Sequence, residues 1–119
     1  MSEERTVFDR IIAKEIPADI VFEDSDILAF KDIHPLAPVH VLVIPKRRIA
    51  TINDLEDADA LLVGKMILVA RDVAREMGIS EKGYKLLFRV GVHGGQEVPH
   101  IHLHVIGGAR LSENIGPVS

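Results

Sequence analysis

The sequence predicts an α+β domain in which helices cover a five-stranded antiparallel sheet. Three observations predict it: about five strand-like runs, one long and one short helical pattern, and short connections on either side of the long helix. The chain has 119 residues, 47% of them hydrophobic and 27% charged. This size allows one buried core but not two, so we expect a single domain over residues 1–119.

The first half of the chain reads as a short helix followed by three strands. Thr6, with the acid Asp9 three residues later, is typical of a helix start, and Pro17 stops the helix. A polar turn at residues 24–26 joins the first two strands, which predicts a hairpin. The three strands are expected at residues 20–23, 27–32 and 39–45.

The second half reads as one long helix followed by two more strands. Apolar residues, including Leu61, recur at three- and four-residue steps from Leu55 to Met77, and Asn53 or Asp54 can cap this helix. A glycine-containing loop separates the last two strands, and the final ten or so residues have too little periodicity for a prediction. The elements expected here are a strand at 84–90, a loop at 91–97, and a last strand that Pro99 begins and Gly107 and Gly108 terminate.

Composition excludes several classes of function. The formal net charge of −4 argues against nucleic acid as the main partner, although a small phosphorylated ligand remains compatible. The chain has no cysteine, which excludes disulfides and thiolate catalysis. No apolar run approaches membrane-spanning length and no signal peptide is visible, so we expect a cytoplasmic protein without a membrane partner.

The most informative feature is a row of three histidines, His100, His102 and His104, at alternate positions of the last predicted strand. In a strand these side chains share one face, with neighbours rooted ~6.6 Å apart. A fourth histidine, His40, lies in another predicted strand. The residues alone leave three interpretations open: hydrogen-bonded structural histidines, a metal site assisted by Glu97 or Asp32, or nucleophilic attack on phosphorus. In the last case, the loop at 94–97 is expected to supply backbone N–H donors to phosphate.

The row resembles the signature of the histidine triad (HIT) superfamily of nucleotide hydrolases and transferases. Segments 8–17, 30–40, 42–46 and 94–96 are similar to its histidine triad nucleotide-binding (Hint) branch, and the likeness covers about residues 7–108. It implies a HIT-like fold and a homodimer whose two sheets join. It also implies a purine nucleoside phosphoramidase, acting on AMP- or GMP-type substrates at the α-phosphate through a covalent nucleotidyl-histidine, with no cofactor or metal. The rivals are a nucleotide-binding sensor or scaffold protein with incidental turnover, and a His-ligated metalloenzyme.

The resemblance gives each matching residue an expected role. His102 corresponds to the nucleophile, while His40, His100 and His104 correspond to histidines that orient it, hold phosphate oxygens and help the leaving group depart. Asp32 corresponds to the residue that grips the ribose hydroxyls. The remaining matches form an apolar slot around the base and a loop beside the phosphate. The slot consists of Phe8, Ile11, Ile16, Phe30 and Ile33, and the loop of Gly95, Gln96 and Glu97.

Details of the motif bear on the branch and leave one residue open. His104 stands where the transferase branch tends to carry glutamine, which favours a hydrolase, and Gly107 and Gly108 suit the Hint branch. Arg89 stands where the family often has asparagine near the phosphates. Arg89 either replaces that contact with a fork-shaped cation or points to solvent, and the sequence does not choose. His34 and His93 lie outside the motif and are interpreted as loop histidines.

Overall fold

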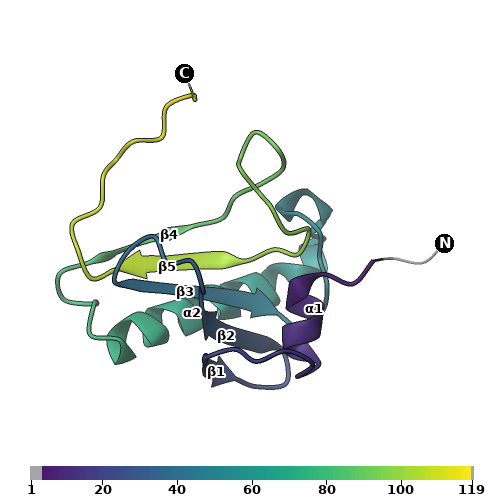
Figure 1. Cartoon of the computed structure of the whole chain (residues 1–119). Coiled ribbons are helices and arrows are strands. Elements are labelled where there is room, and N and C mark those ends of the chain that lie inside the picture. Colours follow the sequence, from purple (N-terminus) through teal and green to yellow (C-terminus); the bar gives the residue numbers. More distant parts are fainter. Residues whose placement is uncertain (1–3, 119) are drawn as a thin grey trace.

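The computed structural model describes residues 4–118. Its centre is a sheet in the order β1-β2-β3-β5-β4, and every neighbouring pair of strands is antiparallel (Figure 1). The five-stranded α+β architecture expected from the sequence is confirmed. The elements are α1 (Val7–Ile12), β1 (Ile20–Glu23), β2 (Ile27–Lys31), β3 (Val39–Pro45), the 3₁₀ turns η1 (Ile52–Asp54) and η2 (Asp57–Asp59), α2 (Ala60–Glu76), β4 (Tyr84–Leu87) and β5 (Leu103–Gly107).

The two faces of the sheet have different partners. The long helix α2 covers one face and packs the main core against it. The short helix α1 lies on the opposite face, where Phe8 and Ile11 pack on Leu28, Phe30 and the rest of a smaller cluster (Figure 1). Because strand side chains alternate, His40 on β3 and His104 on β5 point to the α1 face. The main core therefore supports the sheet from behind, and the histidine face remains available for a site.

Helix α1 is short but well capped. The Thr6 hydroxyl accepts from the Asp9 N–H at 3.1 Å, and the Asp9 carboxylate accepts from the Thr6 N–H at 2.8 Å. This is the reciprocal capping box that the sequence predicts, and it satisfies two otherwise free backbone donors. It fixes the start of the helix that carries Phe8 over the sheet.

The long helix begins later than expected. Asp54 does not cap it, because its carboxylate accepts from the Thr51 N–H at 3.0 Å and closes η1 instead. Leu55 is then extended, η2 adds a second isolated turn, and α2 starts at Ala60. Leu61 is 89% exposed, so its inclusion in the buried stripe is also wrong. The helical periodicity is correct only from Leu62 onward.

The expected last strand, with all three triad histidines in one ladder, is partly wrong. Strand β5 begins at Leu103, so only His104 lies within it, and residues 98–100 form a bend. Pro99 has no N–H to donate, and the ladder partner β3 ends at Pro45, which also lacks one. The prediction that Pro99 starts this strand fails for the same reason. Strand β4 likewise ends at Leu87 rather than at residue 90.

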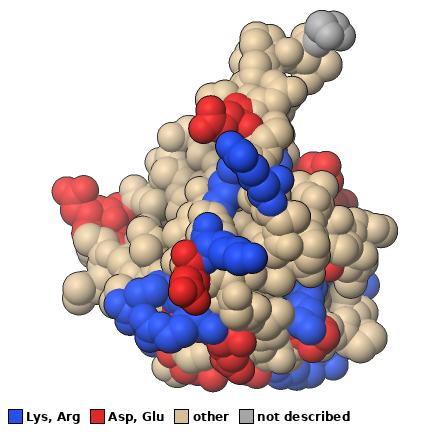
Figure 2. Space-filling model, turned by 90° about the vertical axis from the view of Figure 1, so that its left-hand side faces the viewer, with Lys and Arg blue, Asp and Glu red and all other residues tan. Residues whose placement is uncertain are grey.

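The surface charge and the length of the helices bear on possible partners. On the face seen in Figure 2, acidic and basic side chains are mixed rather than gathered by sign. Across residues 4–118, no helix is long and apolar enough to cross a bilayer.

Candidate active site

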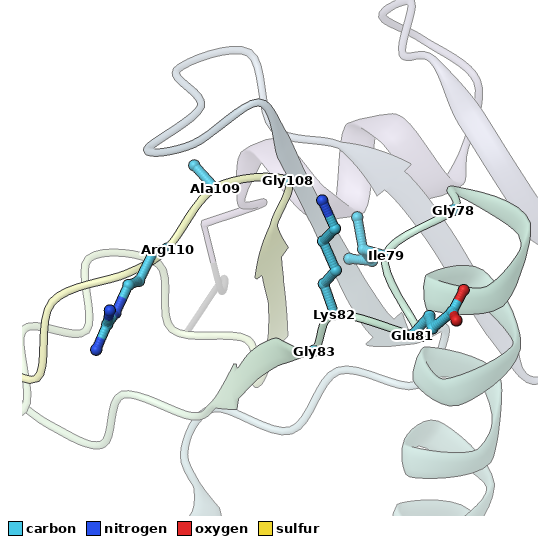
Figure 3. A pocket seen from close by; sticks show the side chains of 8 residues that line it. All are labelled: Gly78, Ile79, Glu81, Lys82, Gly83, Gly108, Ala109 and Arg110. Carbon is cyan, nitrogen blue, oxygen red and sulfur yellow. The ribbon is translucent and has the colours of Figure 1, made fainter.

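Among the hollows of residues 4–118 are two that differ in chemistry, and the histidines line one of them. A cavity of about 670 Å³ on the α1 face is lined by His40, His102 and His104. The other hollow, of about 720 Å³, lies between the end of α2 and the end of β5 (Figure 3). Its lining includes Lys82, Glu81 and Arg110 but none of the triad histidines. The chemistry-bearing residues therefore identify the first cavity as the candidate site.

His102 presents one nitrogen to this cavity and has the other fixed by the backbone. Its Nδ1–H donates to the carbonyl oxygen of His100 at 2.7 Å. Because a carbonyl can only accept, Nδ1 carries the proton and Nε2 keeps its lone pair. The ring is 8% exposed and packs edge-on against Phe8, with centroids 5.0 Å apart. A neutral, oriented imidazole with a free Nε2 is the state that a nucleophile needs.

His40 and His104 form a directional pair beside His102. The Leu36 N–H donates to Nδ1 of His40 at 3.1 Å, so the His40 proton resides on Nε2. That Nε2–H donates to Nδ1 of His104 at 2.9 Å, which places the His104 proton on its own Nε2. This last N–H is buried and has no hydrogen-bond partner among residues 4–118. The pair therefore ends in an unsatisfied donor. The ring of His104, which carries this donor, has its centroid 4.9 Å from that of the His102 ring.

His100 has a different place from the one expected. It is completely buried, and its Nε2–H donates to the carbonyl oxygen of Pro45 at 2.7 Å. It does not line the cavity, so it cannot touch a substrate there. Its backbone carbonyl receives the His102 hydrogen bond, and Phe8 packs edge-on against its ring. Of the roles expected for the flanking histidines, this position favours orienting His102 through the backbone rather than contact with substrate, and that role stays a prediction.

Burial keeps all four rings neutral near neutral pH. Desolvation lowers the pKa of His40, His100 and His102 below 6.5. The effect is largest at His104, where burial first, and then the proximity of the His102 and His40 rings and of the Arg89 cation, lower the pKa to about 3. The imidazoles therefore act as hydrogen-bonding groups of fixed direction.

Asp32 lies just past β2, at the mouth of the cavity. One carboxylate oxygen accepts from the His34 N–H at 2.9 Å, and the other is 3.5 Å from Nε2 of His40. Each oxygen has a further lone pair, and the side chain is 21% exposed. The structure thus brings Asp32 to the histidines, with acceptor capacity remaining for hydroxyl groups.

The predicted apolar slot is one wall of the same cavity. Phe8, Ile11 and Phe30 are buried in it, whereas Ile33 is 82% exposed at its rim. Periodicity alone would mark these residues as core, and only the family resemblance pointed to a slot. The slot residues that line the cavity are Phe8, Ile11, Ile16, Phe30 and Ile33.

The glycine loop departs from expectation in how its polar groups are used. The N–H groups of Gly94, Gly95 and Gln96 donate to carbonyl oxygens within the loop, at 3.2, 3.0 and 3.0 Å. These three amides are therefore not free for phosphate, whereas no such bond is made by the Glu97 N–H within residues 4–118, so a phosphate role of the loop at 94–97 stays a prediction. The Gln96 side chain is also used internally, because it accepts from Gly91 N–H at 3.0 Å and donates to Ala50 O at 2.6 Å. Gln96 is absent from the cavity lining, whereas Gly95 and Glu97 are part of it.

Comparisons with known proteins agree with this arrangement. The family model of the HIT domain matches residues 13–111. This chain belongs to the HIT domain family. It is 48% identical over 108 residues, 91% of each chain, to the purine nucleoside phosphoramidase of Escherichia coli K12. A HIT family hydrolase from Legionella pneumophila superposes with a TM-score of 0.91 at 50% identity, covering 94% of this chain and 100% of the other. The HIT family hydrolase from Clostridium thermocellum gives 0.90 at 42% identity, covering 96% and 99%.

The sequence of this HIT protein left the position of one residue open. Arg89 lines the cavity together with His102 and His104, so the solvent-pointing interpretation is wrong. The register is consistent with this: Leu87 on β4 pairs with His104 on β5, and the same register continued two residues beyond the ladder would set Arg89 opposite His102. Extending strand alternation past Leu87 would have found it. Of the two loop histidines, His34 lines the cavity rim and His93 does not.

One group of side chains in this HIT domain has the composition of a metal site. One atom each from Asp32, His40 and His104 lie within 4.8 Å of one another. Two members of this group, His40 and His104, already share the 2.9 Å hydrogen bond. A metal there would have to replace that bond, because zinc needs a lone pair from each nitrogen at about 2.0–2.1 Å.

Proposed function

We propose that this HIT protein is a purine nucleoside phosphoramidase that hydrolyses substrates at the α-phosphorus through a covalent intermediate on His102. Its family and its 48% identity to a purine nucleoside phosphoramidase support a nucleotide hydrolase. The single observation that carries the mechanism is the His102 hydrogen bond to His100 O, which leaves Nε2 as a lone pair facing the cavity. The base is expected in the apolar slot and the ribose against Asp32.

In the first step, Nε2 of His102 attacks the α-phosphorus and forms an N–P bond while the P–N bond to the leaving amine breaks. The amine needs a proton as it departs. The Nε2–H of His104 is the best candidate for this proton, because it is a buried donor that has no partner in the described chain. In the second step, water attacks the phosphorus as the His102–phosphorus bond breaks, the proton released by the water restores the Nε2–H of His104, and the nucleoside monophosphate leaves. As the resemblance implies, the flanking histidines hold the phosphate oxygens by hydrogen bonds.

We further propose that the protein is a homodimer joined through the free edge of β4, as the resemblance implies. Strands β1 and β4 are the two edges of the sheet. The β1 edge has a register irregularity between Ile20 and Phe22, which discourages pairing, whereas β4 pairs regularly with β5. Leu86 on β4 and Ile20 on β1 are equally exposed, so the regular register is what favours the β4 edge. Light scattering should give a two-chain mass that Leu86→Arg reduces to one chain. The cytoplasmic location expected from the sequence remains a proposal.

The activity is tested by incubating the protein with adenosine 5′-phosphoramidate and measuring AMP release. Wild type should turn over and His102→Ala should not. AMP binding without release in the wild type would instead favour a nucleotide sensor. Turnover that a chelator abolishes would favour a metalloenzyme.

A further inference from the structure

Arg89 is a half-buried cation in the active-site cavity, and its guanidinium is free. Among residues 4–118, no hydrogen bond or ion pair involves this side chain, and Glu97 in the same wall does not pair with it. A guanidinium presents five donors in a planar fork that matches carboxylate and phosphate oxygens. An unpaired guanidinium beside a substrate cavity is therefore available for an anion.

The charge of Arg89 acts on the triad. It is among the causes that lower the pKa of His40, His102 and His104. The guanidinium Nη1 also lies 3.5 Å from the position that a Cβ on Gly95 would occupy. The side chain thus lies between the glycine loop and the histidines.

Three backbone amides of the loop are not available to an anion there. The N–H groups of Gly94, Gly95 and Gln96 are satisfied by carbonyl oxygens within the loop. Arg89 is consequently the charged donor on this side of the cavity.

The strand order places Arg89 relative to the rest of the substrate. Across the sheet, β2 leads to Asp32 and the base slot, β3 and β5 carry His40 and His104, His102 lies just before β5, and β4 leads to Arg89. Arg89 therefore lies beyond the histidines, on the side away from the base. A substrate with its α-phosphorus at His102 extends its leaving group toward Arg89.

We propose that Arg89 binds an oxyanion, a carboxylate or a phosphate, carried by the leaving group, so that the enzyme selects substrates whose departing amine is itself anionic. This inference rests on the proposed phosphoramidase activity and adds the chemical class of the leaving group. A neutral amine would leave the Arg89 donors to water.

Two matched pairs of substrates test it, all with AMP joined through a P–N bond. One pair carries glycine or glycinamide as the leaving amine, and the other carries phosphoethanolamine or ethanolamine. The measured quantity is the ratio of kcat/KM for the anionic member to that for its neutral partner. We expect about 10- to 100-fold in wild type, the range of a hydrogen bond to a charged group, for at least one pair. The pair with the larger ratio tells whether carboxylate or phosphate is preferred.

The variants decide whether Arg89 is responsible. Arg89→Gln should bring the ratio close to one, Arg89→Lys should retain part of it, and Arg71→Gln on the exposed face of α2 should leave it as in wild type. A wild-type ratio near one, or an Arg89→Gln variant that keeps the wild-type ratio while its activity falls on both members, would overturn the proposal. Turnover of the neutral substrates by wild type, lost in His102→Ala, tests the proposed activity separately.

Discussion

Nε2 of His40 lies 2.9 Å from Nδ1 of His104, and this one hydrogen bond orders the protons of both rings. The direction is set outside the pair, because the Leu36 N–H donates to the other nitrogen of His40. A backbone amide in a loop thereby makes His104 Nε2 a proton donor at the cavity wall. The site works through fixed tautomers rather than through charged imidazoles.

The tautomers can be read directly by ¹⁵N NMR of histidine-labelled protein. We expect protons on Nε2 of His40 and His104 and on Nδ1 of His102. Leu36→Pro removes the backbone N–H that donates to Nδ1 of His40. It should therefore mix the His40 tautomers and lower kcat about 10- to 100-fold, part of what a general acid contributes. Leu36→Ala keeps the amide and serves as the control. Unchanged ¹⁵N shifts in a folded Leu36→Pro variant would contradict the assigned direction.

Asp32 should recognise the ribose through its hydroxyl groups. If its carboxylate accepts hydroxyl hydrogen bonds, wild type should favour a ribonucleotide substrate over its 2′-deoxy analogue by about 10-fold in kcat/KM, the scale of a hydrogen bond to a charged group. Asp32→Ala should remove the preference. Asp26→Ala, which removes an exposed carboxylate in the β1–β2 turn, is the matched control. A preference that survives Asp32→Ala would assign ribose recognition elsewhere.

The buried histidines should make stability depend on pH. The folded-state pKa of each lies below 6.5, and that of His104 is about 3, so below pH 6.5 the unfolded chain binds more protons than the folded one. The free energy of unfolding is therefore highest above pH 6.5 and falls as pH drops toward the folded-state values. Each such group contributes a slope of at most ~1.4 kcal/mol per pH unit.

Urea unfolding between pH 7.5 and 4.5 checks this dependence. His104→Gln should show a shallower fall than wild type, whereas His93→Gln, at an exposed loop position, should not. An equal slope in wild type and His104→Gln would mean that His104 is not held neutral by the fold.

Zinc should inhibit this enzyme rather than activate it. Binding to Asp32, His40 and His104 would take the lone pairs that the hydrogen-bonded pair uses and would occupy the carboxylate assigned to ribose. Added zinc is expected to lower turnover, a chelator to restore it, and Asp32→Ala to weaken the inhibition. Loss of activity on chelation, with recovery on adding zinc, would instead support the metalloenzyme.

The sequence predicted the fold well where its signals were local and repeated. The alternation in β2 and β3, the capping box of α1 and the period of α2 after Leu62 all led to the correct elements. It failed at the ends of elements, where partners far along the chain decide. Whether residues 100–102 join a ladder depends on Pro45 opposite them, and whether Asp54 caps α2 depends on its competing bond to Thr51.

The site was predicted by motif, but the division of labour within it was not. The spacing does not distinguish His100 from His104, yet His100 is completely buried away from the cavity and His104 lines it. That difference arises from the bend at residues 98–100, which alternation does not foresee. Arg89 was left open for a different reason. Strand alternation puts it on the same face as Leu87, but only the register of β4 with β5 shows that this face is the one with the histidines.

The most direct test is to trap the nucleotide on His102. Wild-type protein mixed with adenosine 5′-phosphoramidate and quenched in the first turnover should gain the mass of one adenylyl group, located on the peptide that contains His102. His102→Ala should show no adduct, and its turnover should fall by about 10⁴-fold or more, as for other removed nucleophiles. An adduct on another residue, or undiminished turnover by His102→Ala, would contradict the account.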